Sequence, residues 1–81
     1  MEHTRPISLK DLSVDHQATI LAFNFGAIEA TRLVSLGFTP GTEVCMTQNY
    51  GRGPLIVTVR GTRVALGRME AGQILVERCP E

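Results

Sequence analysis

Residues 33–42 read LVSLGFTPGT, and this stretch decides the fold. Apolar residues recur at helical spacing up to Leu36, and Gly37 follows them directly. A glycine at this place predicts a helix that ends in the left-handed conformation, where a Cβ would cost about 1–2 kcal/mol. Phe38 is then expected to fold back onto Leu33 in the last helical turn. Leu33 and Phe38 are therefore predicted to lie in the core.

The corner that follows is set by Pro40 and Gly41, which take the two central positions of a type II turn. Before it, residues 27–36 show the helical period, and after it residues 43–48 alternate between apolar and polar. The sequence therefore predicts a helix, a sharp corner and a strand. The residues predicted to share the apolar helix face are Ala30, Leu33, Val34 and either Leu36 or Phe38.

The rest of the chain predicts short strands separated by glycines. A chain of 81 residues with 43% hydrophobic residues has room for one compact domain. We predict a mainly β fold, a small barrel of about five short strands with one α-helix between strands one and two. Residues 1–6 are expected to be flexible, and Ser8 is expected to cap a short helical turn. The other predicted strands are 17–23, 55–60, 63–66 and 73–78.

A hairpin is predicted around Gly61 and Thr62, as a two-residue type II′ loop. This register would place Arg60 directly opposite Arg63 and Val59 opposite Val64. Two arginines in that position repel each other unless a carboxylate lies near. Two interpretations stay open: a solvated hairpin tip, or a docking surface for an acidic patch on a partner.

Charge and hydropathy narrow the choice of partners. Eight Lys and Arg residues are matched by eight Asp and Glu residues, which gives a formal net charge of +0. This balance removes the main attraction to nucleic acids and anionic membranes. No apolar run is long enough to cross a bilayer, and the first residues lack the apolar core of a secretory signal. We expect a cytoplasmic protein with no nucleic-acid partner and no membrane insertion; an RNA-binding barrel is the weakest alternative.

Metal and catalytic chemistry find little support in the residue pattern. The soft metal ligands other than methionines are His3, His16, Cys45 and Cys79, and no two of them have the spacing of a zinc site. The two thiols are expected to be free and reduced. No nucleophile–base pattern or phosphate-binding loop is present. We predict no enzyme activity, no cofactor and no native metal site, while metal binding through these four residues stays open.

From Leu9 to Glu77 the sequence resembles the FeoA family (ferrous iron transport protein A). The specific block is residues 36–41, supported by the segments 53–57, 59–61, 64–66, 70–71 and 74–76. The resemblance implies an SH3-like barrel. It also implies a non-enzymatic adaptor or regulator that acts by contact with FeoB, a membrane transporter of ferrous iron with a cytoplasmic G domain. The alternative is a metal-linked regulatory module like the C-terminal SH3-like domain of metal-dependent repressors.

Two departures from the family pattern concern the partner surface. The family often has a glycine before strand one, where this chain has residues 14–16, Val-Asp-His. It also often has several basic residues early in the helix, where Arg32 is the only basic residue of segment 28–32 in this chain. Three questions stay open: which surface docks on the transporter, whether the protein activates the transporter or only assembles it, and whether the protein forms a homo-oligomer. The candidate partner contacts are Arg32, Thr39, Pro40, Arg60 and Arg63. The structural motif comprises Leu33, Leu36, Gly37, Phe38, Pro40, Gly41 and Gly61.

Overall fold

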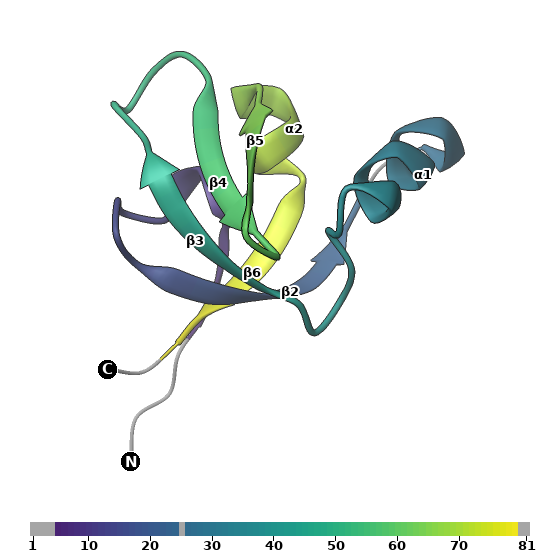
Figure 1. Cartoon of the computed structure of the whole chain (residues 1–81), viewed down its shortest axis with the longest axis horizontal. Helices are drawn as coiled ribbons and strands as arrows, with labels where there is room; N and C mark the ends of the chain where they lie inside the picture. The colour runs from purple at the N-terminus through teal and green to yellow at the C-terminus, as the bar shows by residue number, and fades with distance from the viewer. Residues whose placement is uncertain (1–4, 25, 80–81) are drawn as a thin grey trace.

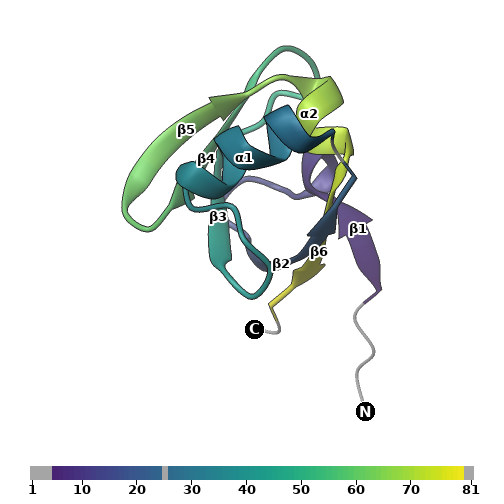
Figure 2. The same ribbon diagram turned by 90° about the vertical axis from the view of Figure 1, so that its right-hand side faces the viewer.

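Six antiparallel strands form one curved sheet, and a single longer helix stands at its side (Figures 1 and 2). The computed structural model describes residues 5–24 and 26–79. The strands are β1 (Pro6–Ser8), β2 (Gln17–Phe23), β3 (Glu43–Gln48), β4 (Leu55–Val59), β5 (Thr62–Leu66) and β6 (Ile74–Arg78). The helices are the 3₁₀ turn η1 (Leu9–Asp11), α1 (Ala27–Ser35) and α2 (Arg68–Gly72).

The order of strands in the sheet is β1-β6-β2-β3-β4-β5, so β1 and β5 are its two ends. Helix α2, which follows β5, is hydrogen-bonded to the last residue of β1 and to η1. Ser8 Oγ donates to the Ala71 carbonyl at 3.2 Å, and Arg68 Nη2 donates to the Lys10 carbonyl at 3.4 Å. The prediction of a small, mainly β fold with one helix between the first two predicted strands is confirmed.

The concave side of the sheet encloses a core in which every buried side chain of the described residues is apolar. Alternate residues of the strands point inward, as a sheet with one buried face requires. Leu9 and Leu12 from the start of the chain complete the core, and Phe38 is its largest side chain. The inward strand residues include Val44, Met46, Leu55, Val57, Val59, Ile74 and Val76.

Strand β1, at one end of the sheet, differs from the sequence prediction. Residues Pro6–Ser8 form β1, a strand that the sequence analysis did not predict, by pairing with Leu75–Glu77 of β6. Ser8 does cap the helical turn, since its side chain accepts from the Lys10 backbone N–H at 3.4 Å. Three residues carry too short a pattern to predict a strand, and only the distant β6 defines it. Of the segment 1–6, residues 1–4 lie outside the described residues.

The register predicted for the β4–β5 hairpin is wrong by two residues. The loop is Arg60 and Gly61, both with positive φ (52° and 78°), and it joins the pair Val59↔Thr62. Positive φ at both central positions is the type I′ turn, whose twist matches the strands better than most alternatives. Arg63 therefore lies opposite Thr58, and the predicted Arg60–Arg63 pair does not form.

Candidate functional site

The C-terminal end of α1 has the backbone geometry that the sequence predicts. The N–H of Phe38 donates to the Leu33 carbonyl at 2.9 Å, and that of Gly37 donates to the Val34 carbonyl at 3.0 Å. Gly37 has a φ of +103°, and Leu33 and Phe38 are fully buried. These are the two hydrogen bonds of a Schellman motif, and the two apolar residues that accompany it both belong to the core. The end of α1 is thereby fixed to the core.

The corner after the helix is equally fixed. Gly41 has a φ of +90°, and the N–H of Thr42 donates to the Thr39 carbonyl at 3.0 Å, as a type II turn requires. Gly41 also donates to the Ile20 carbonyl at 2.8 Å, which ties the turn to β2. Pro40 is exposed at the outside of this turn. The turn therefore sets the direction in which the chain leaves α1 and enters β3.

An open groove lies between this corner and the tip of the β4–β5 hairpin, and we call it the helix–hairpin groove. It encloses about 410 Å³. On the helix side Val34 is 46% exposed and Leu36 is 36% exposed. Val34 is predicted to share the apolar helix face with Leu33, but α1 stands at the side of the sheet and Leu33 is its one buried residue. The lining residues are Val34, Ser35, Leu36, Gly37, Thr39, Val59, Arg60 and Thr62.

The helix side and the hairpin side of the groove meet at Gly37 and Arg60. A Cβ at position 37 would lie 3.2 Å from Arg60 Cδ and 3.4 Å from Val59 Cγ2. The absence of a side chain at Gly37 thus lets the aliphatic part of Arg60 lie against the end of the helix. Arg60 itself is exposed and lines the same groove as Val34 and Leu36.

The structure brings some of the predicted contact residues together and separates others. Thr39 and Arg60 line the groove, with Pro40 beside Thr39 in the turn. Arg63 is exposed on β5, but it does not line the groove. It lies opposite Thr58, so alternation along the strand puts its side chain on the other face of the sheet from Thr62. Arg32 does not line the groove. Its side chain forms an ion pair with Glu70 of α2.

Three of the candidate metal ligands, His16, Cys45 and Cys79, lie among the described residues. The described residues contain no group of three His, Cys, Asp or Glu side chains placed to hold a metal ion. Cys45 and Cys79 are free thiols on either side of Gln17: Cys45 pairs with it in β3, and the Cys79 N–H donates to its carbonyl at 3.0 Å. His3 lies outside the described residues. In the same part of the chain, no helix is long and apolar enough to cross a membrane.

Comparison with known proteins decides the family. The family model described as the FeoA domain matches residues 7–78 of this chain. The chain belongs to the FeoA family. A curated relative, "Putative Fe(2+) transport protein A" of Methanocaldococcus jannaschii, is 39% identical over 46 residues. That match covers 57% of this chain and 55% of the relative, so it spans little more than half the length of either protein.

Solved structures of FeoA proteins have the same fold. A crystal structure of an iron uptake regulatory protein, FeoA, superposes with a TM-score of 0.87 at 27% identity, over 93% of this chain and all of the other. FeoA of Stenotrophomonas maltophilia, solved with zinc and described as a prokaryotic SH3 domain protein, has 35% identity and a TM-score of 0.75. The match covers 86% of this chain and 88% of that protein. The SH3-like fold is therefore confirmed.

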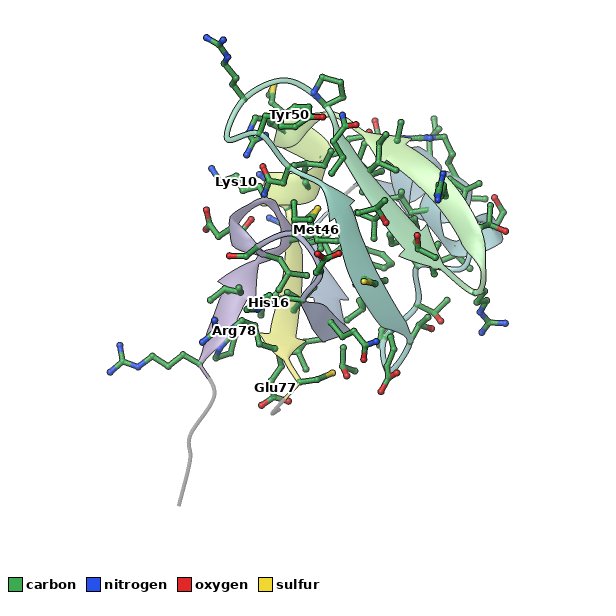
Figure 3. The ribbon with its side chains drawn as sticks, turned by 60° about the vertical axis from the view of Figure 1, so that its left-hand side comes forward. Lys10, His16, Met46, Tyr50, Glu77 and Arg78 are labelled. Atoms are coloured by element: carbon green, nitrogen blue, oxygen red, sulfur yellow. The ribbon has the colours of Figure 1, made fainter. Side chains whose placement is uncertain are left out.

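Sequence reasoning missed one cluster of side chains in this FeoA chain. Asn49 donates to the carbonyls of Lys10 and Leu12, both at 3.0 Å, and its Oδ1 accepts from Arg68 and from the Gly51 N–H, both at 3.0 Å. The segment Asn49-Tyr50-Gly51 is the signal that could have indicated it, since Asn often bonds the backbone two residues on. The cluster links the 49–54 loop to the segment 10–12, and Tyr50 is exposed on that loop (Figure 3).

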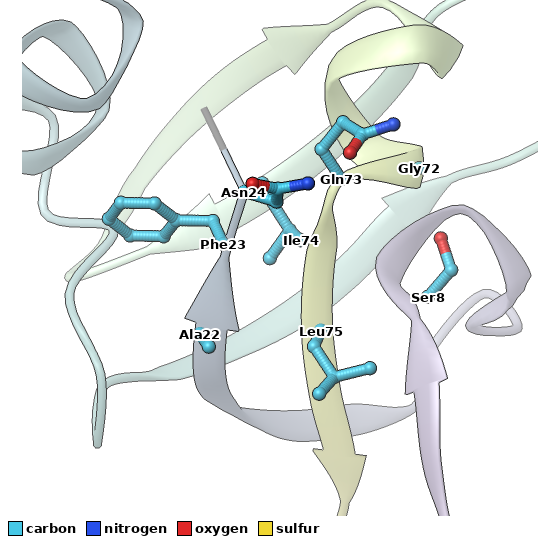
Figure 4. Close-up of a pocket in the computed structure, with 8 residues that line it drawn as sticks. All are labelled: Ser8, Ala22, Phe23, Asn24, Gly72, Gln73, Ile74 and Leu75. Atoms are coloured by element: carbon cyan, nitrogen blue, oxygen red, sulfur yellow. The ribbon is translucent and has the colours of Figure 1, made fainter. Parts of the chain in front are cut away.

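A second groove lies on the outer side of β1, β6 and β2, and encloses about 310 Å³. Figure 4 shows Leu75 between Ser8 and Ala22, its partners on the neighbouring strands. A register shift between Ile20 and Ala22 exposes Ala22 and lets Phe23 pack against the core. All lining side chains are neutral, so this groove has no charged group with which to select a ligand.

Proposed function

We propose that this protein is a non-enzymatic, cytoplasmic partner of a FeoB-type ferrous iron transporter and acts on it by protein–protein contact. Membership of the FeoA family supports a role in ferrous iron transport. The S. maltophilia relative is described as a candidate ferrous iron transport activating factor. The observation that carries the proposal for this chain is the helix–hairpin groove, where exposed apolar residues of α1 lie beside the exposed Arg60.

Arg60 is a residue whose backbone conformation costs stability. Its φ of 52° is in the left-handed region, where Gly and Asn are favoured and other L-residues lose about 1 kcal/mol. Residues kept in such conformations are candidates for function, because a more stable choice is available at the same position. Arg is also among the residues that contribute most to protein–protein interfaces. The hairpin tip therefore favours a contact role over a purely structural one.

The experiment is a binding assay between this protein and the cytoplasmic part of the transporter, including its G domain. We expect a complex in the range of weak signalling contacts, with a Kd on the order of micromolar. Ferrous iron uptake by cells that carry the transporter should fall when this protein is removed and recover when it is supplied again. Two folded proteins that do not associate at high concentration, together with unchanged uptake, would contradict the proposal.

The alternative of a metal-linked regulatory module has the fold alone in its favour. A manganese-dependent transcriptional repressor superposes with a TM-score of 0.84, at 15% identity, over 98% of this chain and 45% of the repressor. At this identity the likeness shows the fold and no function. Calorimetric titration with ferrous iron or zinc separates the two proposals, since the regulatory module requires metal-dependent association and the adaptor does not.

A further inference from the structure

We propose that the helix–hairpin groove binds a short segment of its partner in which an apolar side chain stands next to a carboxylate. This inference rests on the proposed function and adds the chemistry of the segment that is recognised. It follows from the separation of the groove into an apolar wall and a basic wall. The apolar wall is the end of α1, with Val34 and the C-cap residue Leu36 exposed, and the basic wall is the hairpin tip, with the exposed Arg60.

The basic wall has no internal counter-charge. Residues 49–69 contain four arginines and no Asp or Glu, and they form one continuous stretch of β4, β5 and their flanking loops. Neither Arg60 nor Arg63 makes an ion pair with a described residue. Glu43 is the nearest carboxylate by register, one position beyond the Val44↔Val59 pair, and it forms no ion pair with Arg60. A carboxylate supplied by a partner is the complementary group.

The apolar wall excludes a purely charged ligand. Val34 and Leu36 line the groove together with Val59 and are exposed, so an apolar side chain that covers them removes apolar surface from water, which favours binding. Arg60 is the charged residue among those that line the groove. A partner carboxylate is therefore expected on the Arg60 side, and the apolar side chain on the Val34 side.

The test measures binding of the transporter's cytoplasmic part, and of overlapping 12-residue peptides from it, to the protein and its variants. We expect Arg60→Glu to weaken binding at least tenfold and Val34→Ser about fivefold. Arg60→Asn should weaken binding as well, and because Asn suits the turn, a loss of binding there is not a loss of folding. Arg52→Glu is the matched control. Arg52 precedes β4 and Arg60 follows it, so the two lie at opposite ends of the strand, and this variant should bind within twofold of the parent.

The peptide that binds should carry a carboxylate beside an apolar residue, and its affinity should fall when that carboxylate is changed to an amide. If the transporter binds the protein and all the groove variants equally well, the groove inference is overturned while the proposed function stands. If the parent protein does not bind the transporter at all, both are overturned. Amide NMR signals of residues 34–39 that shift on dilution of the protein alone would assign the groove to self-association and overturn the inference.

Discussion

The backbone of Gly37 lies against the side chain of Arg60, so closely that a Cβ at position 37 would come within 3.2 Å of Arg60 Cδ and 3.5 Å of its Nε. Gly37 also has a φ of +103°. Two independent constraints therefore select glycine here: the left-handed backbone that ends α1, and the space that Arg60 occupies. One position thus fixes both the helix end and the orientation of an exposed cation.

Gly37→Ala should lower the free energy of unfolding by about 1–3 kcal/mol, because it adds the left-handed cost to a close contact. The control is Gly51→Ala, where φ is +83° but no atom lies within 4 Å of the new Cβ, so only the backbone cost of about 1 kcal/mol is expected. Urea unfolding measures both. With Arg60→Ala in the background, the loss caused by Gly37→Ala should shrink to the control value. If Gly37→Ala, Gly51→Ala and Gly37→Ala in the Arg60→Ala background all lost the same stability, the contact between position 37 and Arg60 would contribute nothing.

Arg60→Asn should stabilise the isolated protein by about 0.5–1 kcal/mol, because Asn-Gly is the preferred pair for a type I′ turn. In a domain of this size the midpoint of thermal unfolding should rise by roughly 2–8 °C. The matched variant Arg60→Lys keeps the charge and the strained backbone, so its midpoint should stay near that of the parent. A midpoint that does not rise for Arg60→Asn would indicate that Arg60 gains enough from Gly37 to offset its backbone cost.

The features that the sequence predicted are those that depend on neighbouring residues. Gly37, Phe38, Pro40 and Gly41 specify a helix end and a turn within a few positions of one another, and the structure confirms both. The hairpin register failed for a physical reason. Side chains alternate with a period of two, so a shift of two residues leaves Val57, Val59, Val64 and Leu66 on the same face. Matching apolar faces could not choose between the two loops; the φ angles of Arg60 and Gly61 do.

The features that the sequence did not predict depend on distant parts of the chain. Strand β1 exists because Ile7 pairs with Val76, and Asn49 is important because three separate segments meet at its amide group. The exposure of Val34 depends on where α1 stands relative to the sheet. Helical periodicity identifies an apolar face but cannot tell whether the core or a partner covers it. The groove, which is the candidate site, therefore became visible only in three dimensions.

Asn49→Ala should lower the free energy of unfolding by about 1–3 kcal/mol, because it removes the hydrogen bonds to the Lys10 and Leu12 carbonyls and one of the hydrogen bonds of the Arg68 side chain. Asn49→Asp is the sharper variant. It keeps the acceptor for Arg68 but turns the two donations into contacts between a carboxylate and carbonyl oxygens. We expect it also to be destabilised, with faster hydrogen exchange of the amides in the 49–54 loop. If Asn49→Asp were as stable as the parent, the two donated hydrogen bonds would contribute nothing.

Asp15→Gly should be as stable as the parent or more stable, by up to about 1 kcal/mol, because Asp15 has a φ of 70° in the turn before β2. This is the turn in which FeoA sequences often carry glycine. The hydrogen bond from the Asp15 N–H to the Met46 carbonyl, 2.8 Å long, uses only the backbone and is kept. Asp15→Val, which adds a β-branched side chain, should lose stability. Thermal unfolding of the two variants in opposite directions is the expected result, and a loss of stability for both would contradict it.

Cys45 and Cys79 should not form a disulfide within one chain. Both lie across from Gln17 on its two neighbouring strands, which places their Cα atoms about 9.5 Å apart at the ordinary strand spacing. A disulfide needs a Cα separation below about 7 Å. After treatment with diamide under native conditions, the monomer should still react with two equivalents of an alkylating reagent, as measured by intact mass. A monomer lighter by two hydrogens that no longer reacts would show that β2 can leave its place between β3 and β6, and would contradict the strand order described here.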